Sequence, residues 1–220
     1  MLKCVIFDLD GVLVSTDELH YQAWKAIAQK LNVPFTREDN MRQRGVSRME
    51  SLEVVLENCK RPFSREEKLA LAEEKNSLYC SMLSGLGSAD VLPGVRETLA
   101  ILHKKQIVIA VGSSSKNTPE ILRRTGLESE MRVVVSGLDI THSKPHPEVF
   151  IKARQLAGFA PGECLVVEDA ETGVQAAKAA GMRVLAVCAA KDNQQADFRF
   201  ETLEQALAQW PKIFKAFDGA

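Results

Sequence analysis

Two aspartates follow the first apolar run of the chain, in the segment Phe7-Asp8-Leu9-Asp10-Gly11. The run at residues 4–7 is short and continuous, which is typical of a strand buried on both faces of a sheet. Such a strand has no structural need for two carboxylates at its end. Asp8, nearer the strand, could be the covalent acceptor in a group transfer, and Asp10 could move the proton. A polar turn is the alternative interpretation of this triplet taken alone.

Polar residues also follow later apolar runs. Further β-branched runs lie at residues 107–111, 133–135, 164–167 and 184–187, and helical patterns at 94–104, 117–126, 147–157 and 171–180 separate most of them. Strands that alternate with helices predict an α/β fold with a parallel sheet. Ligands bind beyond the carboxyl ends of such strands. The segments at those ends are Ser113-Ser114-Ser115-Lys116-Asn117, Ser143-Lys144-Pro145 and Glu168-Asp169.

These strand ends combine carboxylates, hydroxyls and a lysine. Carboxylates that converge without a cation repel one another, and the pKa of at least one of them rises. A hard divalent cation removes this repulsion, and oxygen ligands favour Mg²⁺. Because Mg²⁺ keeps positions open for phosphate oxygens, the pattern predicts phosphoryl chemistry. Taken singly, Ser113–Asn117 could be a loop that caps the next helix, and Glu168-Asp169 could be a helix cap.

Residues 15–91 follow a different pattern. Ser15-Thr16-Asp17-Glu18 is typical of a capping box before one helix, and Ser64-Arg65-Glu66-Glu67 opens a second long helix. No strand is expected in this region, and residues 84–88 have the composition of a flexible hinge. The sequence therefore predicts a Rossmann-like, doubly wound α/β core (residues 1–14 and 92–220) with an inserted helical cap domain (residues 15–91).

Composition narrows the function classes. The 220 residues are 45% hydrophobic, enough for a full core, and the formal net charge is −1. This balance predicts no nucleic-acid or membrane partner and leaves a monomer as the default. The five scattered cysteines fit reduced thiols in a cytoplasmic protein. His142 and His146 have the spacing of a helical metal pair, but Pro145 between them disfavours that interpretation.

The ordered set of strand-end residues resembles the haloacid dehalogenase superfamily of aspartate-nucleophile phosphotransferases. The resemblance implies that Asp8 is the nucleophile and Asp10 the acid/base. It also implies Mg²⁺ held by Asp8, the Asp10 carbonyl and Asp169, with Glu168 beside them. Ser113 and Lys144 would bind the transferring phosphate.

Within that superfamily the cap is most similar to the β-phosphoglucomutase family. Residues that match Arg48, Ser115, Lys116 and Asn117 grip a second, non-reacting phosphate there, while His20 and Lys75 orient Asp10 as the cap closes. The resemblance thus implies a mutase that converts β-glucose 1-phosphate and glucose 6-phosphate through a bisphosphate. The matching residues are Thr16, His20, Trp24, Arg44, Gly45, Val46, Ser47, Arg48, Lys75 and Asn76 in the cap, with Ser115, Lys116 and Asn117 in the core.

Three departures and several alternatives accompany the resemblance. Ser15 stands where the family usually has aspartate, Arg44 where it has lysine, and Ser114 where it has a small apolar residue. A sugar-phosphate phosphatase is the main alternative, since hydrolysis needs only the strand-end residues. A non-catalytic binding protein is a third class, and a phosphonate-cleaving enzyme would need a cap lysine such as Lys25. Each cap residue also has an ordinary structural role, Trp24 as core and Lys75 as a solvated charge.

Overall fold

The computed structural model describes residues 1–218 and contains one six-stranded parallel sheet. The strand order is β3-β2-β1-β4-β5-β6, so the order reverses beside the central strand β1. This reversal leaves a crevice at the carboxyl ends of the strands, which is where ligands bind in open α/β sheets. The bounds are β1 Cys4–Phe7, β2 Val108–Gly112, β3 Val133–Val135, β4 Cys164–Glu168, β5 Arg183–Ala186 and β6 Phe198–Arg199.

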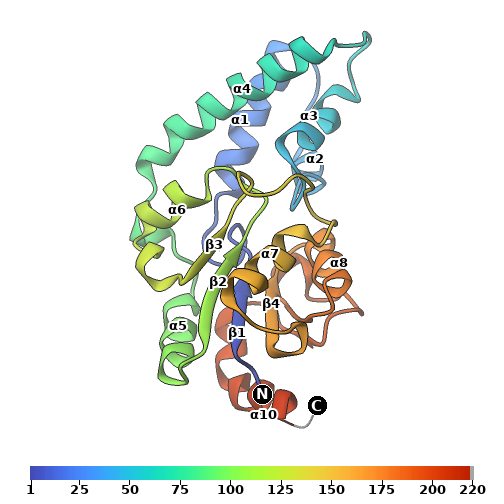
Figure 1. Ribbon diagram of the computed structural model, residues 1–220. Helices are drawn as coiled ribbons and strands as arrows, with labels where there is room; N and C mark the ends of the chain where they lie inside the picture. Colours follow the sequence, from blue (N-terminus) through green and yellow to red (C-terminus); the bar gives the residue numbers. More distant parts are fainter. Residues whose placement is uncertain (219–220) are drawn as a thin grey trace.

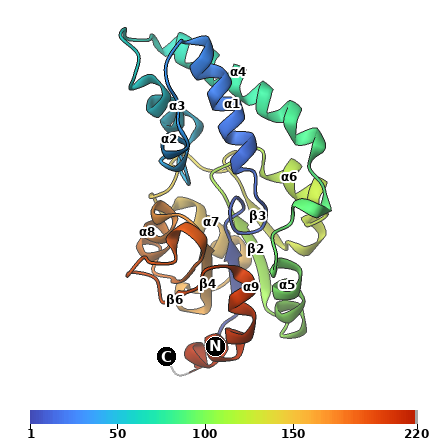
Figure 2. The same cartoon turned by 180° about the vertical axis from the view of Figure 1, so that it is seen from behind.

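Helices cover both faces of the sheet (Figures 1 and 2). Alternate residues of β1 face opposite layers, because successive strand side chains point to opposite sides. Cys4 and Ile6 pack with one layer of helices, and Val5 and Phe7 pack with the other. The first layer is α7 Glu148–Ala157 and α8 Glu171–Ala179; the second is α5 Val95–Lys104, α6 Thr118–Thr125, α9 Leu203–Ala206 and α10 Trp210–Asp218. The predicted doubly wound α/β fold is confirmed.

Four further helices lie beyond the carboxyl ends of the strands, at the top of Figure 1. They have an apolar core of their own, which includes Trp24, Leu52 and Leu71. The second long helix begins after Ser64 as predicted, and a capping box forms there: the Ser64 hydroxyl accepts from Glu67 N and the Glu67 carboxylate accepts from Ser64 N. We call this layer the helical cap: α1 Asp17–Lys30, α2 Arg37–Met41, α3 Arg48–Leu56 and α4 Arg65–Met82.

The two chain segments that join the cap to the sheet lie side by side. Val14 and Val91 form an antiparallel bridge, and Leu92 N donates a hydrogen bond to Leu13 O at 3.0 Å. The predicted hinge at 84–88 overlaps two short 3₁₀ helices, η1 Leu83–Gly85 and η2 Ser88–Asp90. The domain boundary at residues 15 and 91 stays a prediction.

Two local predictions differ from the structure. The capping box at residues 15–18 is wrong: Thr16 is the N-cap of α1, but it makes no side-chain cap. Strand β6 and helices α9 and α10 were not predicted, although Trp210, Ile213 and Phe217 show the apolar spacing of a helix and are buried. Among residues 1–218, no helix has both the length and the apolar character that a membrane span requires.

Candidate active site

Three carboxylates converge where β1 and β4 end. Phe7 pairs with Val167, and Asp8 N donates to Val167 O at 2.9 Å, so Asp8 emerges beside Glu168 and Asp169. One ligand oxygen from each of the three carboxylates lies within 4.8 Å of the others. All three residues are buried. The parallel register therefore assembles the acidic group that the strand ends predicted.

Lys144 is the cation nearest to this group. It comes from the loop between β3 and α7, is 0% exposed, and pairs with Asp8 at 2.5 Å and with Glu168. The other oxygen of Glu168 accepts from Asp169 N at 2.9 Å and Ala170 N at 3.1 Å, just before α8. Glu168 is thus held at both oxygens, and its main role here is to anchor Lys144. One lysine against three carboxylates leaves an excess of negative charge.

The pKa values of Asp8 and Asp169 reflect their burial and the excess of negative charge around them. Burial raises the pKa of Asp8 to about 8, and Glu168 adds to this effect against the opposing charge of Lys144. Burial, followed by the charges of Glu168 and Asp8, raises the pKa of Asp169 well above its usual range. Burial alone would lower the pKa of Lys144, but Asp8 and Glu168 outweigh it and raise that pKa. A cation bound here would return the carboxyls to their ionised form.

Two glycines leave the room that these carboxylates occupy. Gly11 has φ +81°, and a Cβ there would overlap the Asp169 carboxylate. A Cβ on Gly173, in α8, would overlap the Glu168 carboxylate. An all-oxygen donor set with a net negative charge suits a hard divalent cation. The structure therefore shows a buried acidic group that is able to hold a metal ion.

Asp10 points from the same strand end toward the helical cap. Thr16 Oγ1 donates a hydrogen bond to Asp10 Oδ1, and the Tyr79 hydroxyl donates to Thr16 Oγ1 at 3.1 Å. The Thr16 hydroxyl is thus engaged with Asp10 and does not cap α1. Burial raises the pKa of Asp10 to about 6, although the Thr16 bond lowers it. A carboxyl that titrates near neutral pH is suited to proton transfer.

His20 and Lys75 approach Asp10 from the cap. Lys75 Nζ lies 2.8 Å from His20 Nδ1, and burial lowers the pKa of His20 well below its usual value. Lys75 Nζ therefore donates to a neutral His20. The ammonium also lies 4.9 Å from the centre of the Trp24 ring and 4.7 Å from that of Tyr79. Burial and the charge of Arg48 lower the pKa of Lys75 to about 7.

The lowered pKa of Lys75 implies that the stability of the protein depends on pH. Between pH 7 and 10 the unfolded chain protonates Lys75 more readily than the folded chain does, so Lys75 makes stability rise with pH. We expect Lys75→Met to be more stable than the wild type at pH 7 and to lose this advantage toward pH 10. Urea unfolding at pH 7, 8.5 and 10 measures the difference. Lys30→Met, on the exposed end of α1, should show no such trend, and a parallel response in both variants would contradict the burial of a charge at Lys75.

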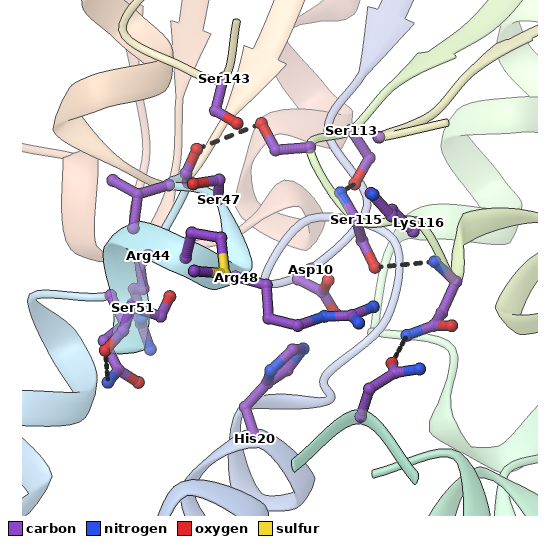
Figure 3. A pocket seen from close by; sticks show the side chains of 18 of the residues that line it. Asp10, His20, Arg44, Ser47, Arg48, Ser51, Ser113, Ser115, Lys116 and Ser143 are labelled. Atoms are coloured by element: carbon purple, nitrogen blue, oxygen red, sulfur yellow. Dashed lines mark hydrogen bonds between the residues drawn. The ribbon is translucent and has the colours of Figure 1, made fainter. Parts of the chain in front are cut away.

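A second polar group lines the facing wall of the site. After β2, Ser113 Oγ accepts from Ser115 N at 3.1 Å, and Ser115 Oγ accepts from Asn117 N at 3.2 Å. Asn117 Nδ2 then donates to Asn76 Oδ1, in α4, at 3.1 Å. Arg48, at the start of α3, lies near Asp10 and His20 (Figure 3). Its guanidinium pairs with the exposed Glu73 at 3.3 Å.

These groups surround one cavity of about 490 Å³ between the sheet and the cap. Within residues 1–218, all but two of the site residues predicted from the sequence line this cavity. The two exceptions lie behind its wall: Thr16 contacts Asp10, and Lys144 contacts Asp8. The predicted residues that line it are Asp8, Asp10, His20, Trp24, Arg44, Gly45, Val46, Ser47, Arg48, Lys75, Asn76, Ser113, Ser114, Ser115, Lys116, Asn117, Glu168 and Asp169.

The comparison with protein families agrees with this arrangement. Residues 2–181 match the model of the haloacid dehalogenase-like hydrolases. The chain belongs to that family. A β-phosphoglucomutase of Bacillus subtilis is 39% identical over 188 residues, which cover 84% of this chain and 83% of the relative. A phosphorylated carbohydrates phosphatase of Thermotoga maritima is 33% identical and covers 82% of both chains.

A solved structure of a haloacid dehalogenase-like relative shares the whole fold. The β-phosphoglucomutase of Clostridium difficile superposes with a TM-score of 0.92 at 32% identity, covering 100% of this chain and 98% of that one. The relatives thus include both a mutase and a phosphatase. The family is established, and its members catalyse more than one reaction.

Two of the three departures noted in the sequence, Arg44 and Ser114, line this haloacid dehalogenase-like site, whereas Ser15 is exposed and does not line the cavity. Arg44 pairs with Asp17 and, at 3.5 Å, with Asp169, so it links the cap to the acidic group. Ser114 Oγ donates to Gly45 O at 3.2 Å, a second bond between core and cap. Sequence reasoning missed Asp17 and Glu73 as site residues, because Asp17 was assigned to a helix cap and Glu73 to a charged helix face.

Proposed function

We propose that the protein is a Mg²⁺-dependent phosphomutase that interconverts β-D-glucose 1-phosphate and D-glucose 6-phosphate through phospho-Asp8 and glucose 1,6-bisphosphate. One observation supports the proposal: a single cavity is lined by more groups suited to phosphate than the transfer to Asp8 requires. Ser113 lines the cavity and Lys144 pairs with Asp8 from behind its wall, while Arg48 of the cap and the Ser115–Asn117 segment of the core line it as well. A phosphatase needs only the first of these two sets of groups, whereas a bisphosphate that turns over needs both.

The names of the relatives support a sugar phosphate as substrate. The Bacillus subtilis and Clostridium difficile proteins are both called β-phosphoglucomutases, and the Thermotoga maritima protein is a phosphatase of phosphorylated carbohydrates. The cavity has room for a hexose with two phosphates, since it is within the usual size of small-molecule sites. We also propose that residues 15–91 act as a movable cap domain.

The chemistry assigns one step to each group. The C6 hydroxyl of β-glucose 1-phosphate attacks the phosphorus of phospho-Asp8 while Asp10 takes the hydroxyl proton, which frees Asp8 and forms the bisphosphate. After the bisphosphate turns over, Asp8 attacks the phosphorus at C1. The C1–oxygen leaves with the proton that Asp10 returns, giving glucose 6-phosphate and phospho-Asp8. The pKa of Asp10, about 6, suits both directions of this proton transfer.

The residues around Asp8 position the transferring phosphoryl group. Asp8, Asp169 and the Asp10 carbonyl would hold Mg²⁺, which when bound offsets negative charge on that group. Ser113 would bind a phosphate oxygen, and Lys144 would offset the charge of Asp8 and of the phosphoryl group that it carries. Across the cavity, Arg48 can make a bidentate, charge-assisted contact with the second phosphate in place of its present contact with Glu73.

A sugar-phosphate phosphatase is the second candidate, favoured by the Thermotoga maritima relative. In that case water, rather than a sugar hydroxyl, would accept the phosphoryl group from Asp8. The cap decides between the two, because His20 and Lys75 approach Asp10 from the cap. If cap closure aligns Asp10 only when sugar fills the cavity, water is a poor acceptor.

Arg48→Ala separates these functions. We expect this variant to lose about 10- to 100-fold in mutase kcat/KM, which is the effect of removing one charge-assisted hydrogen-bonding group. It should still hydrolyse p-nitrophenyl phosphate at the wild-type rate, because that ester has no second phosphate. Arg42→Ala is the matched control, since Arg42 is an exposed cap arginine paired with Glu57 outside the cavity lining.

The assay supplies β-glucose 1-phosphate, Mg²⁺ and a trace of glucose 1,6-bisphosphate, and follows glucose 6-phosphate and free phosphate in parallel. Glucose 6-phosphate that forms faster than free phosphate establishes a mutase. Free phosphate alone establishes a phosphatase and contradicts the proposal. Equal losses in both activities of Arg48→Ala would remove Arg48 from the second phosphate site.

A further inference from the structure

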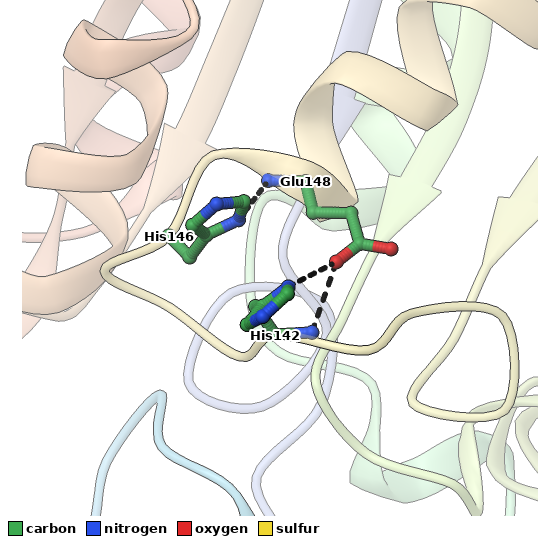
Figure 4. A group of neighbouring side chains, drawn as sticks. All are labelled: His142, His146 and Glu148. Atoms are coloured by element: carbon green, nitrogen blue, oxygen red, sulfur yellow. Dashed lines mark hydrogen bonds and ion pairs between the residues drawn. The ribbon is translucent and has the colours of Figure 1, made fainter.

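Two histidines and a glutamate lie together outside the cavity, on the loop between β3 and α7 (Figure 4). The ring centres of His142 and His146 are 4.6 Å apart. Pro145 does prevent a helix here, but His146 N donates to Ser143 O at 3.0 Å and closes a turn that brings the rings together. The two rings therefore meet through a turn and not through the helix that Pro145 excludes.

Glu148, at the start of α7, completes the group. Its Oε2 lies 3.2 Å from His142 Nδ1, and its backbone N donates to His146 Nδ1 at 3.3 Å. Lys152 pairs with the other oxygen, Oε1, at 3.0 Å. Ligand atoms of all three residues lie within 4.8 Å of one another. Two ring nitrogens and a carboxylate oxygen are therefore gathered within 4.8 Å of one another at the surface.

The spacing of these atoms resembles that in a metal site. Tetrahedral Zn²⁺ with bonds of about 2.0–2.1 Å holds its ligand atoms roughly 3.3 Å apart. His142 Nδ1 and Glu148 Oε2 already have nearly this spacing, so a metal ion could replace the proton between them. The His146 nitrogen lies within 4.8 Å of these atoms and can move closer, because His146 is exposed and its ring can change rotamer.

We propose that His142, His146 and Glu148 bind a divalent transition-metal ion of the Zn²⁺ class. Imidazole ligands favour Zn²⁺, Cu²⁺ and Ni²⁺, whereas Mg²⁺ prefers oxygen. This donor set thus differs from the buried oxygen group of Asp8, Glu168 and Asp169, and the two sites select different metals. Water would complete the coordination, because the histidines are exposed.

The site lies on the outer face of the loop that delivers Lys144 to Asp8. Lys144 is between the two histidines in sequence, and neighbouring Thr141 and Ser143 line the cavity. An ion bound by residues 142, 146 and 148 would cross-link this loop at three points. Metal binding outside the cavity would therefore stabilise the folded form of a loop that belongs to the reaction site.

The test is a Zn²⁺ titration of the full chain in excess Mg²⁺, followed by NMR of the histidine rings. We expect the signals of His142 and His146 to shift together with the first equivalent of Zn²⁺. His103 is the matched internal control, because it is an exposed histidine paired with Glu130 at 2.7 Å without a second histidine. Shifts of similar size at His103 would overturn the proposal.

Variants give the second measurement. In competition with a chromophoric chelator, His142→Ala and His146→Ala should each weaken Zn²⁺ binding by about 10- to 100-fold or more, and His103→Ala should not change it. Zn²⁺ should also raise the thermal midpoint of the wild type and of His103→Ala, but not of His142→Ala. Equal affinity in wild type and His142→Ala would refute the site, and the wild-type NMR result stands even if a variant fails to fold.

Discussion

Asp8→Asn should lower turnover by about 10⁴-fold or more, since an amide oxygen cannot form the acyl phosphate. The same variant should be no less stable than the wild type at pH 7. Burial raises the pKa of Asp8 to about 8, so the folded chain binds a proton there more readily than the unfolded chain, and ionised Asp8 costs stability as pH rises. A neutral asparagine removes that cost.

Three measurements check this expectation. An activity assay measures the loss of turnover. Phosphoprotein analysis after quenching with acid shows whether residue 8 carries phosphate, and urea unfolding at pH 7 tests whether the fold is intact. Asp192→Asn, an exposed aspartate away from the cavity, is the control and should keep full activity. Unchanged activity of Asp8→Asn would exclude Asp8 as the nucleophile.

Lys144→Met should cause the largest loss of stability among the substitutions considered. Lys144 is fully buried and neutralises part of the charge of Asp8 and Glu168. Removing one partner of a buried ion pair typically costs about 3–5 kcal/mol, because the remaining charges stay buried. The free energy of unfolding, from urea titration at pH 7, measures this cost.

The pH and metal dependence of Lys144→Met distinguish charge from packing. Without the ammonium, Asp8 and Asp169 take up protons more readily in the folded state, so this variant should lose more stability than the wild type as pH rises from 5.5 to 8. Mg²⁺ should restore part of the loss. Lys178→Met removes an exposed pair with Asp197 and should cost about 1 kcal/mol or less at either pH. A deficit in Lys144→Met that is independent of both pH and Mg²⁺ would indicate lost packing instead.

The sheet was predictable because its strands carry their own signal. Continuous β-branched runs such as 107–111 and 164–167 belong to strands covered on both faces, and helices between them require parallel pairing. Strand β6 was not predictable in the same way. It has two residues, Phe198 and Arg199, lies at the edge of the sheet, and is too short for a periodicity.

The part of the site that lies at the strand ends was predictable, because the order of strands along the chain implies where their ends meet. Asp8, Lys144 and Asp169 follow strands that end at one edge, so topology brings them together whatever the cap does. The Arg44–Asp17 pair, in contrast, depends on how the cap rests on the core, which local sequence does not encode. Thr16 shows a related limit, because a threonine before a helix is equally suited to cap it or to bond a distant carboxylate.

The paired linkers limit how the cap can move. Residues 13–14 and 91–92 are hydrogen-bonded to each other, so the two segments that join the cap to the sheet form one paired linker and do not act as two independent ones. The cap motion proposed above would therefore be a rotation about this paired linker. Such an opening would separate Asn76 from Asn117 and Gly45 from Ser114 in one movement, so release of the proposed second phosphate site would accompany withdrawal of His20 and Lys75 from Asp10.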